Sequence, residues 1–295
     1  MSNTVPKILI TGATGQVGGK TIDYLMSQDN IEIVAAVRNK TKAAEFEDRG
    51  IATVILDFDD DSTHLSAFEG IDRLFMVTGY TVDMLLQSKV LLDNAKKAGI
   101  KHVVHLGACG PDDTTVGHWA WHQLVERYIE WGGFSFTHLR PQDFMQNLLS
   151  YGNKKAIVDG VINAYVADAR LSWVDVDDLA LVAALALAHP ETHGRKTYRL
   201  SYDAKTFDEL ADLMTQIIGK PFRYEALSPE IFLQSMQDAG AEMTYMTCVY
   251  NHWKRHAAGT IPNASETFDN FYEITGKQPT TWADFIEKHK AQLDY

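Results

Sequence analysis

Short apolar segments alternate with amphipathic segments through the first half of the chain. The apolar segments lie near residues 6–11, 32–37, 52–56, 72–78, 101–107 and 134–139. Apolar residues at helical spacing occur near residues 16–27, 41–49, 83–98 and 119–131. Strands that alternate with helices predict a parallel sheet with helices on both faces, so we expect ligands at the carboxyl ends of the strands.

This alternation loosens beyond residue 150, although residues 171–178 and 196–200 still look like strand segments that return to the core. We therefore predict an α/β fold: a Rossmann-type, doubly wound parallel sheet with a smaller, interleaved C-terminal subdomain. The expected division is a nucleotide-binding domain over residues 1–150 and a mainly substrate-binding subdomain over residues 151–295.

Two segments of the C-terminal half carry the signal of a helix start. Thr206 precedes Glu209 by three residues, and Thr281 precedes Asp284 in the same way. A threonine followed three residues later by an acidic residue predicts a capping box, in which each side chain bonds a backbone N–H group of the other.

Three regularly spaced glycines, Gly12, Gly15 and Gly18, follow the first apolar segment. Gly12 allows a tight turn, Gly15 lets backbone N–H groups approach a phosphate, and Gly18 lets the next helix pack on the sheet. The N-terminus of that helix then faces the anion. A plain structural turn is the alternative. The predicted pyrophosphate-binding residues are Gly12, Thr14, Gly15, Gln16, Val17 and Gly18.

The second apolar segment ends in a basic cluster, Arg38-Asn39-Lys40-Thr41-Lys42, where an acidic residue would bind a ribose 2′-hydroxyl group. Guanidinium and ammonium groups neutralise a 2′-phosphate instead. We therefore expect NADP(H) as the cofactor, bound by Arg38, Asn39 and Lys42. A solvated basic helix start is the alternative.

Two further loops are expected to contact the cofactor. Asp57 and Phe58 follow the third apolar segment, where a carboxylate and a ring could hold adenine; an ordinary capping loop is equally compatible with these residues. Val77, Thr78 and Gly79 end the fourth segment, and the small residues among them would let the cofactor pass close to the backbone.

Composition narrows the expected partners and the expected compartment. The chain has 295 residues, enough to bury a sizeable core, and a formal net charge of −12, which argues against nucleic acid or an anionic membrane as a partner. Its two cysteines, Cys109 and Cys248, form no disulfide framework and suit a reducing cytoplasm. Residues 179–188 are apolar but too few to cross a bilayer, so we expect a buried helix and a cytoplasmic protein without a targeting segment.

The order of the motifs resembles the NmrA-like branch of the atypical short-chain dehydrogenase/reductase superfamily, and the resemblance covers nearly the full chain. It rests on Thr11–Gly15, Val37–Asn39, Leu56–Asp59, His118–Glu126 before Gly132 and Gly133, Thr137–Asn147, Trp173–Asp178 and Pro279–Phe285. The resemblance implies the fold and an NADP(H) cofactor. It also implies either a reductase of quinones, azo compounds or dyes, or a catalytically silent protein that senses NADP.

The superfamily's usual chemistry uses a serine after the fifth strand and Tyr-x-x-x-Lys on the next helix. Residues 106–110 and 118–122 stand at these places and contain none of the three residue types. His118 and His122 share one helix face, with Glu126 one turn further along. We expect His122 to hold the nicotinamide ribose or donate a proton, with His118 as a second catalytic candidate.

The two histidines also have other interpretations. A His-x-x-x-His pair can bind zinc, but no nearby Cys/His pattern supplies further ligands, so we expect no metal. Capping or packing of the helix is the structural alternative. The expected floor and wall of the acceptor site come from four residues beyond the sixth segment, which could equally form a structural crossover: Pro141, Phe144, Met145 and Asn147.

Together these features predict an NADPH-dependent reductase of a small conjugated electrophile. Hydride transfer needs little from side chains because the cofactor carries the reactive hydrogen, and quinone-like acceptors depend least on a dedicated acid. The alternative is a regulator that senses NADP(H) and binds a protein partner. We expect a small-molecule acceptor and neither nucleic acid nor membrane, while a homo-oligomer or a protein partner stays open.

Overall fold

The computed structural model describes residues 5–150 and 156–295, which form two compact units. Unit 1 comprises Met1–Ala108, Trp119–Arg140 and Leu179–Tyr198. Unit 2 comprises Cys109–His118, Pro141–Asp178 and Arg199–Tyr295. The chain therefore passes several times between the units, and the functional division at residue 150 stays a prediction.

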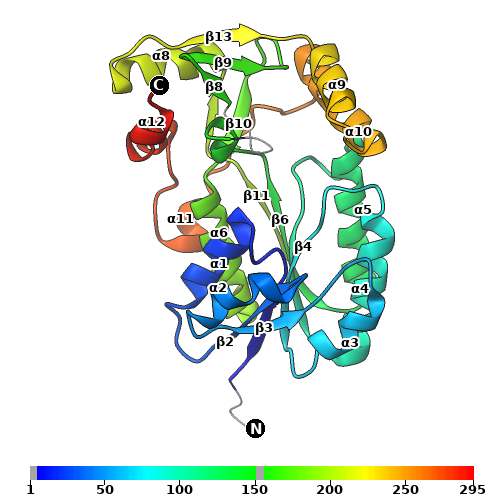
Figure 1. Cartoon of the computed structure of the whole chain (residues 1–295). Coiled ribbons are helices and arrows are strands. Elements are labelled where there is room, and N and C mark those ends of the chain that lie inside the picture. The colour runs from blue at the N-terminus through cyan, green and yellow to red at the C-terminus, as the bar shows by residue number, and fades with distance from the viewer. Residues whose placement is uncertain (1–4, 151–155) are drawn as a thin grey trace. The chain divides into compact units, whose positions relative to one another are not determined.

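A seven-stranded sheet in the order β11-β6-β5-β4-β1-β2-β3 organises unit 1 (Figure 1). Its strands are β1 (Lys7–Ile10), β2 (Glu32–Val37), β3 (Ala52–Ile55), β4 (Arg73–Val77), β5 (His102–Leu106), β6 (Ser135–Pro141) and β11 (Lys196–Leu200). From β3 through β6, every neighbouring pair is parallel. This confirms the predicted Rossmann-type sheet and all six strands expected in the first half of the chain.

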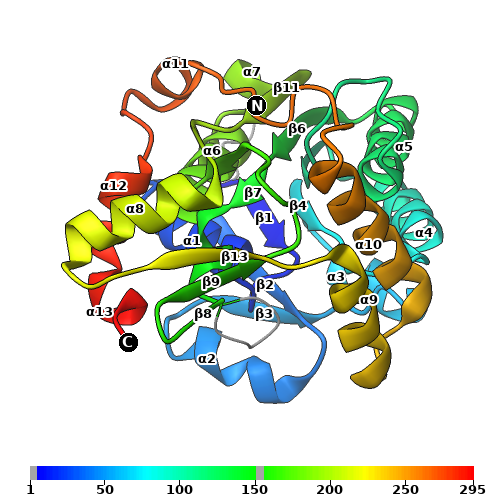
Figure 2. The same ribbon diagram turned by 90° about the horizontal axis from the view of Figure 1, so that it is seen from above.

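Helices cover both faces of this sheet, with α1 and α6 on one face and α3, α4 and α5 on the other (Figures 1 and 2). On the second face, strand residues such as Leu74 and Val103 pack against Phe68, Leu91 and Val125 of these helices and their ends. The helices of this part are α1 (Gln16–Leu25), η1 (Lys40–Lys42), α2 (Ala44–Glu47), η2 (Asp61–Thr63), α3 (His64–Ala67), α4 (Met84–Ala98), α5 (Gly117–Trp131), α6 (Val176–Ala188) and α7 (Pro190–His193).

Unit 2 contains two three-stranded sheets. One consists of β7 (Asp143–Phe144), β10 (Leu171–Val174) and β12 (Asp203–Lys205), and the other of β8 (Ile157–Val158), β9 (Val161–Ala164) and β13 (Arg223–Ala226). Trp173, Phe207 and Trp282 lie at the centre of its apolar core. Its helices are η3 (Met145–Leu148), α8 (Phe207–Ile218), α9 (Pro229–Asp238), α10 (Met243–Ala257), α11 (Phe271–Thr275), α12 (Trp282–Lys288) and α13 (Lys290–Leu293).

The expected strand over residues 171–178 is shorter than predicted. It ends at Val174, because the carboxylate of Asp175 accepts the backbone N–H of Asp177 at 2.8 Å and so caps the start of α6. β10 pairs with β7 and β12, whereas β11 joins the seven-stranded sheet. Both predicted capping boxes are present, at the starts of α8 and α12.

The apolar run at residues 179–188 belongs to helix α6 and is largely buried, as predicted. In the part of the chain that the structure describes, no helix has both the length and the apolar character needed to cross a bilayer.

Candidate functional site

The turn after β1 is built so that two of its glycines cannot carry a side chain. Gly12 has φ +62°, and a Cβ atom there would lie 3.0 Å from Cβ of Val77. A Cβ atom on Gly18 would lie only 2.2 Å from the carbonyl oxygen of Gly12. The Gly15 N–H donates to that same oxygen at 2.9 Å and closes the turn. The glycines therefore bring α1 against the end of β1, as their spacing predicts.

The start of α1 is open to an anion. Gly15 is its N-cap residue, no described side chain caps the helix, and its first turn contains no acidic residue. Gly12, Thr14, Gly15 and Gln16 are exposed, whereas Val17 packs inward. The N–H groups at the start of a helix have no partner within the helix and carry a partial positive charge, so this turn fits a pyrophosphate.

The carboxyl ends of four strands gather the predicted cofactor residues at one edge of unit 1. β1 pairs with β2 and β4, and β2 pairs with β3, so the loops after these strands are neighbours. Thr11 ties β1 to β4: its hydroxyl accepts the N–H of Val77 at 2.8 Å and donates to the carbonyl of Phe75 at 2.9 Å. The turn after β1 is thus held rigidly beside Val77.

The side chains of the basic cluster after β2 differ in exposure and in the partners that they contact. Arg38 is exposed, and its guanidinium forms no ion pair with the described residues. Asn39 caps η1, because its side-chain oxygen accepts the N–H of Lys42 at 3.3 Å. Nζ of Lys42 lies 3.2 Å from Oε1 of Glu45, which partly compensates its charge. Arg38 is therefore the better candidate for an anionic ligand.

The loops after β3 and β4 carry the remaining predicted cofactor residues. The Asp57 carboxylate accepts the N–H of Asp59 at 3.0 Å, and Phe58 packs against the core beneath α3 and α4. Both contacts are those of a capping loop, and the adenine role stays a prediction. A Cβ atom on Gly79 would meet only Thr81, at 3.9 Å, so packing within the described chain does not require glycine there.

His122 on α5 contacts a second histidine, His105, at the end of β5. Nδ1 of His122 lies 3.3 Å from Nε2 of His105. His105 is fully buried, and its pKa lies well below the ordinary 6.5 because of burial and the nearby His122, His138 and Arg140. His105 is therefore neutral, and the proton donor or acceptor role of His122 depends on a buried neutral partner.

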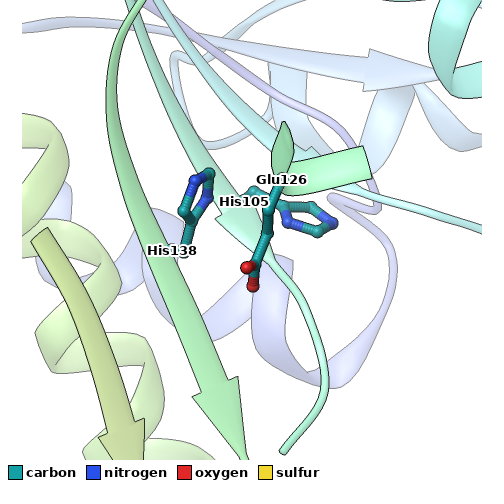
Figure 3. A group of neighbouring side chains, drawn as sticks. All are labelled: His105, Glu126 and His138. Atoms are coloured by element: carbon teal, nitrogen blue, oxygen red, sulfur yellow. The ribbon is translucent and has the colours of Figure 1, made fainter. Parts of the chain in front are cut away.

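Beneath this pair lies a buried ion pair between Arg140 of β6 and Glu126 of α5. Nε and Nη2 of Arg140 lie 2.9 and 2.6 Å from the two carboxylate oxygens of Glu126. Figure 3 shows Glu126 between the rings of His105 and His138, and ligand-type atoms of these three residues lie within 4.8 Å of one another. A divalent cation there would face the Arg140 guanidinium, so the geometry favours an ion pair over a metal centre.

His118 has different surroundings, in unit 2. Its Nδ1 lies 3.9 Å from Sγ of Cys248, and its ring lies 5.0 Å from that of His252 on α10. Burial lowers the pKa of His118 to about 4. These contacts suit a packed, neutral histidine, so His122 is the stronger catalytic candidate of the two.

The predicted acceptor residues belong to unit 2 and differ in accessibility. Pro141, which ends β6, is buried, and Met145 is fully buried in the core of unit 2. Phe144 and Asn147 are half-buried. Their contact with an acceptor stays a prediction.

The sequence interpretation missed His105, His138 and Arg140. A partial signal was present: His138 and Arg140 are two residues apart on one strand, so both side chains lie on the same face of the sheet. That His105 lies opposite His138 on the neighbouring strand is seen only in the structure. Glu126 on α5 is the acidic partner that such a buried basic group requires.

The chain is similar to proteins of one family along nearly its whole length. The NmrA-like family matches residues 4–286. An NAD(P)H azoreductase of Xenophilus azovorans is 29% identical over 289 residues, 96% of this chain and 98% of the relative. Quinone oxidoreductase 2 of Escherichia coli (strain K12) is 30% identical over 236 residues, 79% of this chain and 82% of the relative.

Among solved structures, a Citrobacter sp. triphenylmethane reductase in complex with NADP(H) matches with a TM-score of 0.81 at 26% identity, covering 96% of this chain and 99% of that one. NmrA, a negative transcriptional regulator in complex with NAD, matches with a TM-score of 0.73 at 16% identity over 97% and 95% of the two chains, which shows the fold alone. The glycine turn, the parallel sheet and the match along nearly all of the sequence agree: the chain belongs to the NmrA-like family.

Proposed function

We propose that the protein is an NADPH-dependent reductase of small conjugated acceptors such as quinones, azo compounds or dyes. The cofactor part rests on the open start of α1 and on the exposed Arg38, which forms no ion pair with residues 5–150 or 156–295. One feature binds a pyrophosphate, and the other distinguishes a 2′-phosphate from a hydroxyl group. The relatives named as azoreductase, quinone oxidoreductase and triphenylmethane reductase support the acceptor class.

NADPH, when bound, supplies the hydride. The residues of the chain then have to orient the cofactor and the acceptor and stabilise the negative charge that develops on the acceptor. In this proposal the glycine turn holds the pyrophosphate and Arg38 holds the 2′-phosphate. In this proposal His122 donates a hydrogen bond to the acceptor oxygen or to the nicotinamide ribose. A quinone reduced by hydride becomes a hydroquinone anion, which takes its proton from water.

The acceptor class follows from the missing catalytic groups. Residues 106–110 and 118–122 lack the serine, tyrosine and lysine that assist carbonyl and alcohol chemistry in this superfamily. A quinone accepts hydride without a dedicated strong acid, because the hydroquinone anion delocalises its charge. The same absence also favours the second candidate, a protein that binds NADP(H) without turnover and acts on a protein partner.

Steady-state oxidation of NADPH against a panel of quinones, azo compounds and triphenylmethane dyes tests the proposal. We expect turnover with at least one acceptor class, and a lower kcat/KM with NADH. Tight NADPH binding with no turnover across the whole panel would exclude the reductase and leave the sensor.

Cofactor choice gives a sharper test. We expect Arg38→Ala to weaken NADPH binding by about 1.5–3 kcal/mol, because one charge-assisted contact to the 2′-phosphate is lost, and to change NADH binding little. Isothermal titration of both cofactors measures the difference. The matched control is Lys40→Ala, which removes a neighbouring exposed charge. An equal loss for both cofactors in Arg38→Ala would contradict the assignment of Arg38.

A further inference from the structure

The contact between His105 and His122 determines which nitrogen of each ring carries hydrogen. A hydrogen bond between two imidazole nitrogens needs an N–H group on one side and a lone pair on the other. The distance of 3.3 Å from Nδ1 of His122 to Nε2 of His105 fits such a bond. Its direction is not visible in the heavy atoms and has to be inferred from the surroundings.

His105 has a single hydrogen to place. It is fully buried, and burial together with His122, His138 and Arg140 keeps its pKa well below 6.5, so the ring is neutral at physiological pH. Its Nδ1 is buried and has no hydrogen-bond partner among residues 5–150 and 156–295. A hydrogen on Nδ1 would bury an unpaired N–H group, whereas a hydrogen on Nε2 has an acceptor in His122. The second arrangement is the more stable one.

The charges around the pair also oppose a second proton. Arg140 of β6 is buried, and both oxygens of Glu126 on α5 already compensate its charge. Arg127 lies 3.9 Å from the same carboxylate and 2.6 Å from that of Glu130, so its charge is compensated as well. An extra proton on the buried His105 would therefore add a cation beside Arg140, whose carboxylate partner is already engaged.

We propose that His105 is a positioning residue that donates its Nε2–H to Nδ1 of His122 and thereby fixes His122 as the neutral Nε2–H tautomer. His122 then presents a hydrogen-bond donor, and it polarises an acceptor oxygen or holds a ribose hydroxyl without giving up its proton. Neutral imidazoles stabilise developing oxyanions in this way in other enzymes. The claim that Nε2–H of His122 contacts an acceptor oxygen or a ribose hydroxyl rests on the proposed function. The claim about the tautomer does not.

Nitrogen NMR of the ring atoms tests the tautomer without any turnover. The protein is labelled with ¹⁵N-histidine, and long-range ¹H–¹⁵N correlations are recorded at pH 7.5. The His122 signals are assigned by their loss in His122→Gln. His64 provides an internal reference, because its Nε2 lies 2.8 Å from the carbonyl oxygen of Asp57 and therefore carries hydrogen. We expect the His122 pattern to match that of His64. Hydrogen on Nδ1, or on both nitrogens, would overturn the proposal.

Two substitutions of His105 separate positioning from packing. In His105→Gln a side-chain amide can still donate at the place of Nε2, so we expect His122 to keep its tautomer and kcat to change less than about threefold. His105→Leu fills the space without a donor; we expect mixed tautomers and a loss of about tenfold or more in kcat at nearly unchanged KM. Equal kcat in both variants, with the His122 tautomer unchanged in both, would also overturn the proposal. Failure of the protein to reduce any acceptor would refute the proposed function and leave the NMR result standing.

Discussion

A buried charge needs a partner of opposite charge that is buried with it, and Arg140 and Glu126 form such a pair. Both side chains are at most 5% exposed, and two hydrogen bonds of 2.9 and 2.6 Å join them. Removing one partner leaves the other charge in a medium that solvates it poorly. Replacing both residues with apolar ones leaves no buried charge without a partner. The pair therefore binds α5 to β6 strongly only as long as both members are present.

We expect Glu126→Gln to destabilise the protein by about 3–5 kcal/mol, because the Arg140 guanidinium loses its counter-charge. Differential scanning fluorimetry should show a melting temperature lower by roughly 10 °C. Glu225→Gln is the matched control: it breaks the ion pair of Arg223 and Glu225, whose side chains are 65% and 51% exposed, and should change the melting temperature by no more than about 3 °C. The double variant Glu126→Gln, Arg140→Met should recover part of the loss. A Glu126→Gln protein as stable as the wild type would contradict this account.

At the scale of helices and strands, an element could be predicted from the sequence where its start or end is determined by contacts between residues close together in the chain. The capping boxes at Thr206 and Thr281 and the turn around Gly12 arise from contacts over a few residues, and all three were predicted correctly. The end of the strand at Val174 depends on Asp175, and aspartate is disfavoured in strands and favoured as an N-cap residue. The predicted strand over residues 171–178 therefore ran past a local helix-start signal that the sequence contains.

The candidate site also has a part that could be predicted from the local sequence and a part that could not. The phosphate-binding turn is contiguous in sequence, so its residues could be named from spacing alone. The environment of His122 comes from β5 and β6, and a single sequence does not show which strand residues meet a given helix position. His118 and His122 share a helix face by spacing, yet their observed contacts are with Cys248 and His105 respectively.

The packing of α1 on β1 gives a matched pair of substitutions. A Cβ atom on Gly18 would lie 2.2 Å from a backbone oxygen, whereas one on Gly19 would lie 3.4 Å from the carbonyl oxygen of Ala13, an ordinary contact. We expect Gly18→Ala to lower the melting temperature by several degrees and to weaken NADPH binding, because α1 must move away from the turn. Gly19→Ala should be neutral or stabilising by up to about 1 kcal/mol, since alanine favours the helix. Equal behaviour of the two variants in fluorimetry and titration would contradict the proposed role of Gly18.

At the scale of the whole molecule, several buried histidines of the described chain have lowered pKa values. Burial lowers the pKa to about 4 in His102, His118 and His256 and to about 3 in His138. Burial acts in the opposite sense on two carboxyl groups, raising the pKa of Asp143 to about 7 and that of Asp178 to about 6. The histidines outnumber the carboxyl groups, so their protonation should dominate how stability depends on pH.

The sign of the change in stability with pH follows from the difference in proton binding between the folded and the unfolded chain. A histidine with a depressed pKa in the folded state contributes stability above pH 6.5 that is lost as the pH falls toward 4, because only the unfolded chain then binds the proton. Each fully buried histidine of this kind costs about 2 kcal/mol at pH 5. A carboxyl group with a raised pKa contributes stability at low pH that is lost as the pH rises through 6 to 7. On acidification from pH 7.5 to 5, the two carboxyl groups therefore offset only part of the loss from the histidines.

We expect the melting temperature to fall steadily between pH 7.5 and pH 5 at constant ionic strength, and His138 allows the cause to be tested. Its ring stacks on that of Phe136 with 4.4 Å between the ring centres, and its Nε2 lies 3.4 Å from Oε1 of Glu130 without forming a hydrogen bond. Phenylalanine can stack on Phe136 in the same way and has no group to protonate. His138→Phe should therefore reduce the acid-induced loss by about 2 kcal/mol, while the exposed control His189→Gln leaves it unchanged. A melting temperature that is constant or rises toward pH 5, or an unchanged slope in His138→Phe, would show that these buried histidines do not govern the acid stability of the protein.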